Sequence, residues 1–241
     1  RLIEAPYRRA SMPEIMVAET DSTLTQAAVV ASRRLAEYGA ATLADAKDRC
    51  RTAGVACETE YVTGIVANVI LKRTADADLV VVGRRGEGAE WAGPQLGSVL
   101  ESIVRFAQAP VLAVQAEMRP ITRILVAFDG SERAVHVLKI AAEMASHKQR
   151  ALIVLTVDDG VGGRHQAWKM GKEMLADRDQ KATHLFVTGH ATAEILRLAT
   201  DEKCDLTALG SYGHGHFVEI VFGSTVDEVL HRAVSPVLIC R

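Results

Sequence analysis

The chain has 241 residues, of which 49% are hydrophobic and 24% are charged, so it is long enough for two globular domains of about 120 residues each. Its 28 basic and 30 acidic residues give a net charge of −2, which excludes the strongly basic field of a nucleic-acid-binding protein. No apolar run approaches the roughly 20 residues of a membrane-spanning helix, and the first residues resemble neither a signal peptide nor a transit peptide.

The first part of the chain predicts strands and helices in alternation. Its longest element is a helix over 22–53, in which Ala28, Ala31, Leu35 and Tyr38 lie on one face. The other expected elements are, in order, a strand end at 1–5, a loop at 6–21, a strand at 57–62, a helix at 65–75, an apolar strand ending at Gly83, a helix from Ser98 and a strand at 111–114.

A short connector over 117–122, with Pro120 inside it, leads into a second and more regular series of elements. The expected elements are, in order, strand 123–128, helix 132–146, strand 151–157, a loop at 158–163, a short helix around 168–174, strand 184–188, helix 193–203, strand 206–209, a glycine loop, a helix from Ser224 and strand 237–240. Alternation of this kind predicts a parallel sheet with helices on both faces.

The two parts are copies of one domain, which we place at residues 1–118 and 119–241. In both, an apolar strand, a glycine loop, a Gly-Ser pair and a helix precede a proline, at a constant offset that indicates duplication. The matched pairs, 126 or 127 positions apart, are Gly83 with Gly210, Gly97 with Gly223, and Pro110 with Pro236.

The first copy is expected to be incomplete at its N-terminus and to lack its first strand and helix. If 1–5 and 15–19 were its first two strands, only nine residues would join them, which is too few for the crossover helix between parallel neighbours. Either those elements lie upstream of Arg1, or this copy is degenerate.

The end of the second copy carries the most informative motif. Two residues separate Gly210 from Gly213, and nine more precede Gly223 and Ser224. A strand, a glycine loop and a helix N-terminus together present free N–H groups and a positive dipole end to an anion. This spacing resembles the nucleotide-binding motif of the universal stress protein (UspA-like) family, and the resemblance covers essentially the whole chain.

The resemblance implies two tandem α/β domains, each a doubly wound parallel sheet of the adenine nucleotide alpha hydrolase-like kind with strand order 3-2-1-4-5. Ligands of such sheets bind beyond the carboxyl ends of the strands, at the switch point between strands 1 and 4. The resemblance also implies ATP, with or without Mg²⁺, with an aspartate at adenosine, an apolar adenine pocket and a glycine loop around the phosphates. The residues concerned are Asp129, Gly130, Val157, Gly210, Tyr212, Gly213, Gly223, Ser224 and Thr225.

The same residues also have a purely structural interpretation. Asp129-Gly130-Ser131 is typical of a turn followed by a helix cap. Gly223 and Ser224 are typical of a helix start, with Ser224 as the expected N-cap.

A second nucleotide site in the first copy stays open. Its glycines and Ser98 fit the motif with ten intervening residues instead of nine. Glu87 and Glu90, however, bring negative charge to the place where phosphates would lie, and the sequence holds no counterpart of Asp129 in this copy.

No catalytic or metal-binding pattern accompanies the motif. Gly213-His214-Gly215-His216 is similar to the HxGH signature of nucleotidyltransferases, but that signature belongs after the first strand, where this chain has Asp129. The two histidines lack a third ligand in the sequence, so we infer no metal site. The sequence also lacks a GxxxxGK[ST] loop and a GxSxG elbow. Four cysteines without CxxC spacing indicate reduced thiols in a cytoplasmic protein.

These observations predict a tandem universal stress protein whose C-terminal copy binds ATP as a stress-response sensor or regulator, with at most slow hydrolysis. The alternatives are an interaction module of the same fold without nucleotide, and an enzyme such as a slow ATPase or a nucleotidyltransferase. The expected partners are an adenine nucleotide and a second chain in a homodimer, with neither nucleic acid nor membrane. The last strands of the two copies, 111–114 and 237–240, would each be an exposed apolar edge that favours pairing with another strand. The resemblance implies that these last strands pair with each other, so we expect them to lie antiparallel.

Overall fold

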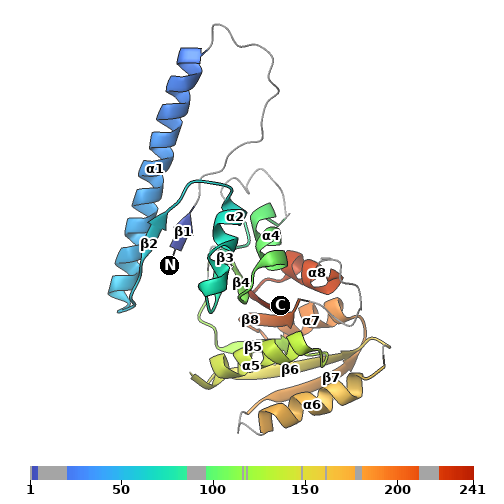
Figure 1. Cartoon of the computed structure of the whole chain (residues 1–241). Coiled ribbons are helices and arrows are strands. Elements are labelled where there is room, and N and C mark those ends of the chain that lie inside the picture. Colours follow the sequence, from blue (N-terminus) through green and yellow to red (C-terminus); the bar gives the residue numbers. More distant parts are fainter. Residues whose placement is uncertain are drawn as a thin grey trace. The chain divides into compact units, whose positions relative to one another are not determined.

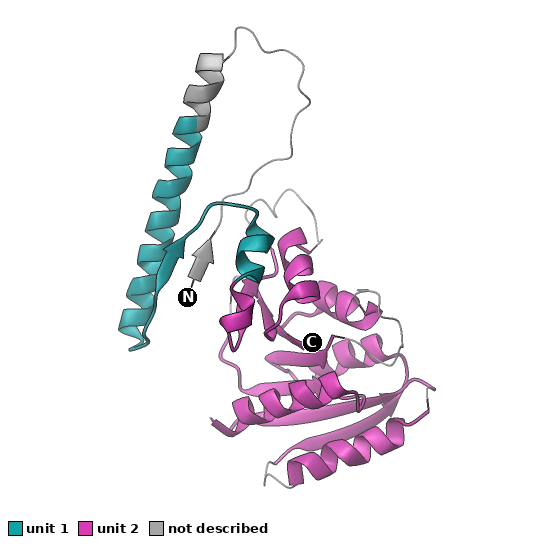
Figure 2. Ribbon diagram, in the orientation of Figure 1, with its two compact units in different colours: residues 1–72 teal, residues 73–241 magenta. Residues whose placement is uncertain are grey.

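The computed structural model describes residues 2–4, 21–85, 96–115, 117, 119–147, 149–160, 162–176, 181–211 and 223–241, with the backbone alone for 2–4 and 21–28. The chain forms two compact units, residues 1–72 and 73–241, which Figure 2 shows in separate colours. Among the described helices, none has the length and apolar character needed to cross a membrane.

The first unit contains the long helix α1 (Asp21–Thr52), which confirms the helix predicted at 22–53. The chain leaves this helix at Gly54, whose φ of +69° is a left-handed conformation that glycine adopts at little cost. The strands β1 (Leu2–Glu4) and β2 (Thr59–Tyr61) pair in parallel, and α2 (Val66–Leu71) follows them in the chain.

A seven-stranded sheet forms the centre of the second unit, with its strands in the order β3-β4-β9-β8-β5-β6-β7 (Figure 1). All neighbours pair in parallel except β4 and β9. The strands are β3 (Val80–Gly83), β4 (Val111–Val114), β5 (Arg123–Ala127), β6 (Ala151–Asp158), β7 (Thr183–Thr188), β8 (Leu206–Gly210) and β9 (Val237–Cys240).

Helices lie on both faces of this sheet, as the alternation of strands and helices predicts. α5 (Glu132–His147) and α6 (Arg164–Ala176) pack on one face. α7 (Ala191–Asp201) and α8 (Ser224–Arg232) pack together on the other. The unit also contains the 3₁₀ turn η1 (Thr74–Asp76) and α4 (Ser98–Phe106).

The core beneath α5 crosses from one copy to the other. Val137 and Leu138 of α5 are fully buried in a cluster that includes Leu112 of β4 and Leu238 of β9. Each large apolar side chain buried in this way contributes about 1.5–3 kcal/mol to stability. The cluster therefore joins the end of the first copy to the second copy as well as filling the second copy itself.

Within the second copy the strand order is β7-β6-β5-β8-β9, which confirms the predicted order 3-2-1-4-5. The described strands of the first copy instead form two separate pairs, β1 with β2 and β3 with β4. In the described part of the first copy, no strand takes the place that β5 has in the second. The compact units thus divide the chain by contacts, whereas the two copies divide it by sequence similarity.

β4 lies antiparallel to β9, the pairing expected for the last strands of the two copies. Leu112 faces Leu238, and Ala113 faces Val237. Ala113 and Val237 are completely buried. Each strand thereby covers an edge of the other that would otherwise offer unpaired N–H and C=O groups.

The largest difference from the predicted elements concerns α6. A short helix was expected around 168–174, but α6 begins at Arg164 and has 13 residues. Gly160 and Gly163 in the preceding loop have φ angles of +83° and +90°, so the chain turns sharply after β6 and enters the helix early.

Candidate functional site

The residues predicted to bind a ligand follow the carboxyl ends of neighbouring strands. β5 and β8 pair in parallel, with Ala127 opposite Leu209. Asp129 follows β5 by two residues, and Gly210 ends β8. The chain crosses from β5 to β6 on one side, whereas β8 lies on the other, so the ends of β5 and β8 flank the switch point of the sheet.

The two carboxylate oxygens of Asp129 have different partners, one in a turn and one in an ion pair. Its Oδ1 accepts a hydrogen bond from the Ser131 amide at 3.0 Å, and its Oδ2 lies 3.8 Å from Nη1 of Arg164. The Ser131 hydroxyl oxygen accepts a hydrogen bond from the Ala134 amide at 3.2 Å and so caps α5. The turn and the cap expected at this position are both present, while 28% of the Asp129 side chain remains exposed.

Gly130 and Gly210 are both required by packing. Gly130 has a φ of +83°, and a Cβ atom there would lie 2.9 Å from the Cβ atom of Ala167 in α6. A Cβ atom at Gly210 would lie 3.0 Å from the amide nitrogen of Ala134 in α5. The first turns of α5 and α6 therefore press against the strand ends, and these two glycines allow that approach whether or not a ligand binds.

Arg164 belongs to this region but was not identified from the sequence. Its side chain is only 11% exposed, and it donates hydrogen bonds to both carboxylate oxygens of Asp159, at 3.1 and 3.0 Å. These bonds, opposed by burial and aided by the charges of Asp159 and Asp129, raise the pKa of Arg164. In the sequence, Arg164 falls between the predicted loop and the predicted helix and has no predicted role. The one local feature that could have indicated an ion pair is the acidic pair Asp158-Asp159, a few residues before it.

Val157 brings an apolar side chain to the same edge. It is the last residue but one of β6 and is 9% exposed. The Phe128 amide donates a hydrogen bond to the Leu155 carbonyl at 2.8 Å, so β6 follows the chain of β5 beyond its last strand residue. Val157, two residues after Leu155, therefore reaches the level of Asp129.

The start of α8 shows that the predicted role of Ser224 as N-cap is wrong. Gly223 is the N-cap, with φ −61° and ψ 129°, and no side chain makes a capping hydrogen bond. Glycine and serine are both common N-cap residues, and here Gly223 has the extended backbone of an N-cap. The first helical hydrogen bond runs from the Asp227 amide to the Gly223 carbonyl at 3.0 Å. The N–H groups of Ser224, Thr225 and Val226 therefore have no acceptor within the helix, and N–H groups of this kind can bind an anion.

Part of the predicted set falls beyond the structural description. Tyr212 and Gly213 lie outside the described residues, and so do His214 and His216. The structure brings Asp129, Gly130, Val157 and Gly210 together at the ends of β5, β6 and β8. It places Gly223, Ser224 and Thr225 at the start of α8, the helix that follows β8 in the chain.

The matching region of the first copy is arranged differently. α4 begins at Ser98 with Gly97 as its N-cap and without a side-chain cap, which is the same start as that of α8. The Gly97 amide, however, donates a hydrogen bond to the Arg84 carbonyl at 3.2 Å. Glu87 and Glu90 lie outside the described residues.

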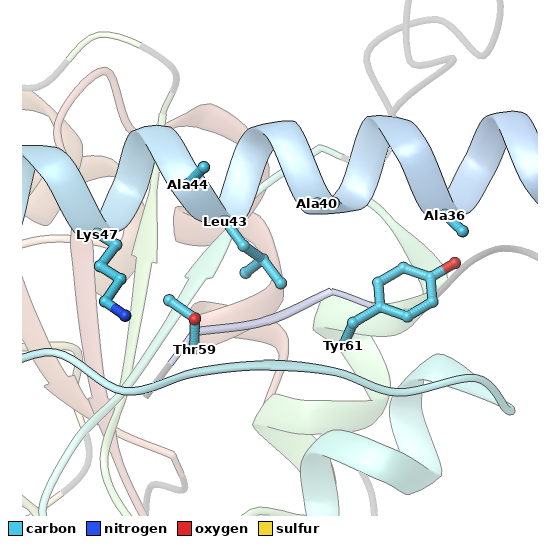
Figure 3. Close-up of a pocket in the computed structure, with 7 residues that line it drawn as sticks. All are labelled: Ala36, Ala40, Leu43, Ala44, Lys47, Thr59 and Tyr61. Atoms are coloured by element: carbon cyan, nitrogen blue, oxygen red, sulfur yellow. The ribbon is translucent and has the colours of Figure 1, made fainter.

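A groove of about 480 Å³ lies within the first unit, between α1 and β2 (Figure 3). Its lining residues are Ala36, Ala40, Leu43, Ala44, Lys47, Thr59 and Tyr61. The Tyr61 ring packs so closely on α1 that a Cβ atom at Gly39 would lie 2.6 Å from it. The groove is thus the seam along which β2 packs on small residues of α1. In the described ranges, no three His, Cys, Asp or Glu residues gather in a way that could hold a metal ion.

Sequence comparison with known proteins covers nearly the whole chain. The sequence model of the universal stress protein family matches residues 9–115, 120–182 and 161–241. The universal stress protein Slr1230 of Synechocystis sp. is 29% identical over 202 residues, which covers 83% of this chain and 70% of that protein. The universal stress protein Rv2623 of Mycobacterium tuberculosis is 26% identical over 204 residues, which covers 76% of this chain and 68% of that protein.

Structural comparison gives the same fold. The crystal structure of a universal stress protein from Archaeoglobus fulgidus matches with a TM-score of 0.72 and 21% sequence identity, and the match covers 87% of this chain and 78% of that chain. At this level of identity the likeness concerns the fold, in which helices cover a sheet of mainly parallel strands.

Proposed function

Because the chain belongs to the universal stress protein family, we propose that its second copy binds ATP and that the protein serves a stress response as a sensor or regulator in the cytoplasm. The observation that carries the proposal is the start of α8. Ser224, Thr225 and Val226 offer N–H groups without helical acceptors, directly after the loop that leaves β8. Such a helix start binds phosphate groups well, because its N–H groups and its dipole both favour an anion.

The charges at the strand ends favour one orientation of the nucleotide. Asp129, Asp158 and Asp159 outnumber Arg164 near the ends of β5 and β6, which disfavours phosphate there. Adenosine is uncharged, and its hydroxyl and amino groups can donate hydrogen bonds to a carboxylate. The proposal therefore places adenosine near Asp129 and Val157, and the phosphates at Gly223, Ser224 and Thr225.

ATP acts in this proposal as a bound signal. The Asp129 carboxylate is held by the Ser131 amide and faces the Arg164 guanidinium, which suits a group that orients a ligand. The two alternatives are an interaction module without nucleotide and an enzyme, either a slow ATPase or a nucleotidyltransferase. Measuring ADP formed during prolonged incubation with ATP separates the ATPase from the sensor.

The test uses Ser224→Ala in the full chain. Loss of a hydroxyl that donates to a charged phosphate should weaken ATP binding about tenfold in titration calorimetry. Because Ser224 makes no capping bond, its replacement should change the free energy of unfolding by less than about 0.5 kcal/mol. Ser98→Ala, at the first residue of α4, is the matched control and should leave ATP affinity unchanged.

Unchanged ATP affinity in the Ser224→Ala variant would contradict the placement of the phosphates at α8. Failure of the wild-type chain to bind ATP would favour the interaction module. Mass spectrometry of ligand released from the purified protein identifies the natural ligand. Light scattering with and without ATP tests whether occupancy changes self-association.

A further inference from the structure

Arg84, in the glycine loop of the first copy, contacts the end of a helix in the second copy. It follows β3 directly and is only 9% exposed. Its Nη1 donates a hydrogen bond to the Ala233 carbonyl at 2.5 Å, and its Nη2 donates one to the Leu230 carbonyl. These acceptors lie at the C-terminal end of α8, 149 and 146 positions later in the chain.

The backbone of Arg84 is fixed as well. Its amide donates to the Val114 carbonyl at 2.8 Å, and its carbonyl accepts from the Gly97 amide at 3.2 Å. Arg84 is therefore held between β4 and the start of α4 while its guanidinium lies at α8. The Gly97 amide is the counterpart of the Gly223 amide, and in this arrangement it already has an acceptor.

A guanidinium group suits the end of α8. The last carbonyl groups of a helix lack partners inside the helix and form the negative end of its dipole. Burial, together with the neighbouring charge of Arg85, lowers the pKa of Arg84. Arginine nevertheless stays charged in proteins, and the two carbonyl acceptors offset part of the free energy lost when the charge leaves water.

The second copy has no arginine at the position that matches Arg84. Ser211 is the counterpart of Arg84, because Gly210 matches Gly83. Its side chain is buried and much shorter than that of arginine. The Ser211 hydroxyl has no hydrogen-bond partner among the described residues.

We infer that Arg84 of the first copy holds the end of α8, and that it positions the proposed phosphate-binding start of this helix instead of serving a second nucleotide site. The consequence for ATP rests on the proposed function. α8 has nine residues and is about 13 Å long, so it moves as one short rod. Holding its end at Leu230 and Ala233 therefore also restrains its start at Ser224, and each chain binds one ATP.

The test compares neighbouring arginines in the full chain. Arg84→Met removes both donors and keeps an apolar stem, whereas Arg84→Lys keeps the charge without the planar pair of donors. Arg85→Met changes an exposed neighbour and is the matched control. We expect ATP affinity to fall about three- to tenfold in Arg84→Met, less in Arg84→Lys, and to stay within about twofold in Arg85→Met. The α8 amides should also exchange hydrogen faster in Arg84→Met than in Arg85→Met.

Two ATP molecules per chain, or wild-type affinity in a folded Arg84→Met variant, would overturn the inference. If Arg84→Met does not fold, Arg84→Lys is judged by the same criteria. If the wild-type chain binds no ATP, the proposed function fails, and hydrogen exchange still decides whether Arg84 holds the end of α8. Equal exchange of α8 in the Arg84 and Arg85 variants would then refute it, and faster exchange in the Arg84 variant would support it.

Discussion

Gly130 and Gly160 have the same φ of +83° but different surroundings. A Cβ atom at Gly130 would lie 2.9 Å from that of Ala167, whereas one at Gly160 would meet no atom of the described residues within 4 Å. We predict that Gly160→Ala costs about 1 kcal/mol, from the left-handed backbone alone. Gly130→Ala should cost at least about 1 kcal/mol more, because α6 must shift to make room. Urea unfolding measures both changes, and equal costs would contradict the contact with α6.

The four thiols divide by burial. Burial raises the pKa of Cys204 to about 11 and that of Cys240 to about 12. Cys50 and Cys57 are partly exposed. The pKa of Cys50 is raised, mainly by a hydrogen bond with Cys57 and to a smaller extent by burial. The thiolate is the reactive form, so a raised pKa lowers the reactive fraction at pH 8.

We therefore predict that iodoacetamide at pH 8 modifies Cys57 and Cys50 well before Cys204 and Cys240. Peptide mass spectrometry over time measures the four rates, and the same reaction in denaturant provides the control, in which the rates should converge. Labelling of Cys240 in the native chain as fast as that of Cys57 would contradict its burial in β9.

At the scale of elements, the antiparallel pairing of β4 with β9 can be tested by its register. Ala113 directly faces Val237. Opposite residues of such strands have Cα atoms about 4.5–5.5 Å apart, which is within disulfide range. In a chain whose native cysteines are replaced by serine, Ala113→Cys with Val237→Cys should form a disulfide within one chain.

The matched control is Ala113→Cys with Leu238→Cys. Successive side chains of a strand point to opposite faces, so this second pair should stay reduced under the same conditions. Non-reducing electrophoresis and peptide mapping distinguish the two chains. Cross-linking of the control pair, or of neither pair, would show that the register differs from the one described.

At the scale of the whole molecule, much of the second copy is predictable because its signals are local. Short apolar runs identify buried strands such as β5 and β8, and the Gly-Ser pair locates the start of α8 to within one residue. An apolar edge strand in each copy favours pairing with another strand, and the resemblance to the universal stress protein family implied that β4 and β9 pair with each other. The register of that pair cannot be predicted from either strand alone, since it depends on contacts between residues far apart in the sequence.

Contacts between distant side chains are not predictable in this way. The Arg84 guanidinium contacts the Leu230 carbonyl of α8, which lies 146 positions later in the chain and so more than one domain away in sequence, and no periodicity marks such a pair. Arg164 lies in a segment whose composition resembles a loop, although it begins α6. At α8, glycine and serine are both good helix caps, so the sequence does not determine which of two adjacent residues takes that place.

The antiparallel junction also reverses the polarity of the sheet between its second and third strands, β4 and β9. The carboxyl ends of β3 and β4 lie at the rim where β8 and β9 begin, so the two glycine loops follow strands that end at opposite rims. Even a four-residue strand is about 13 Å long, so the two rims are separated by at least about that distance. α8 joins these two rims, because it starts after the end of β8 and ends before the start of β9.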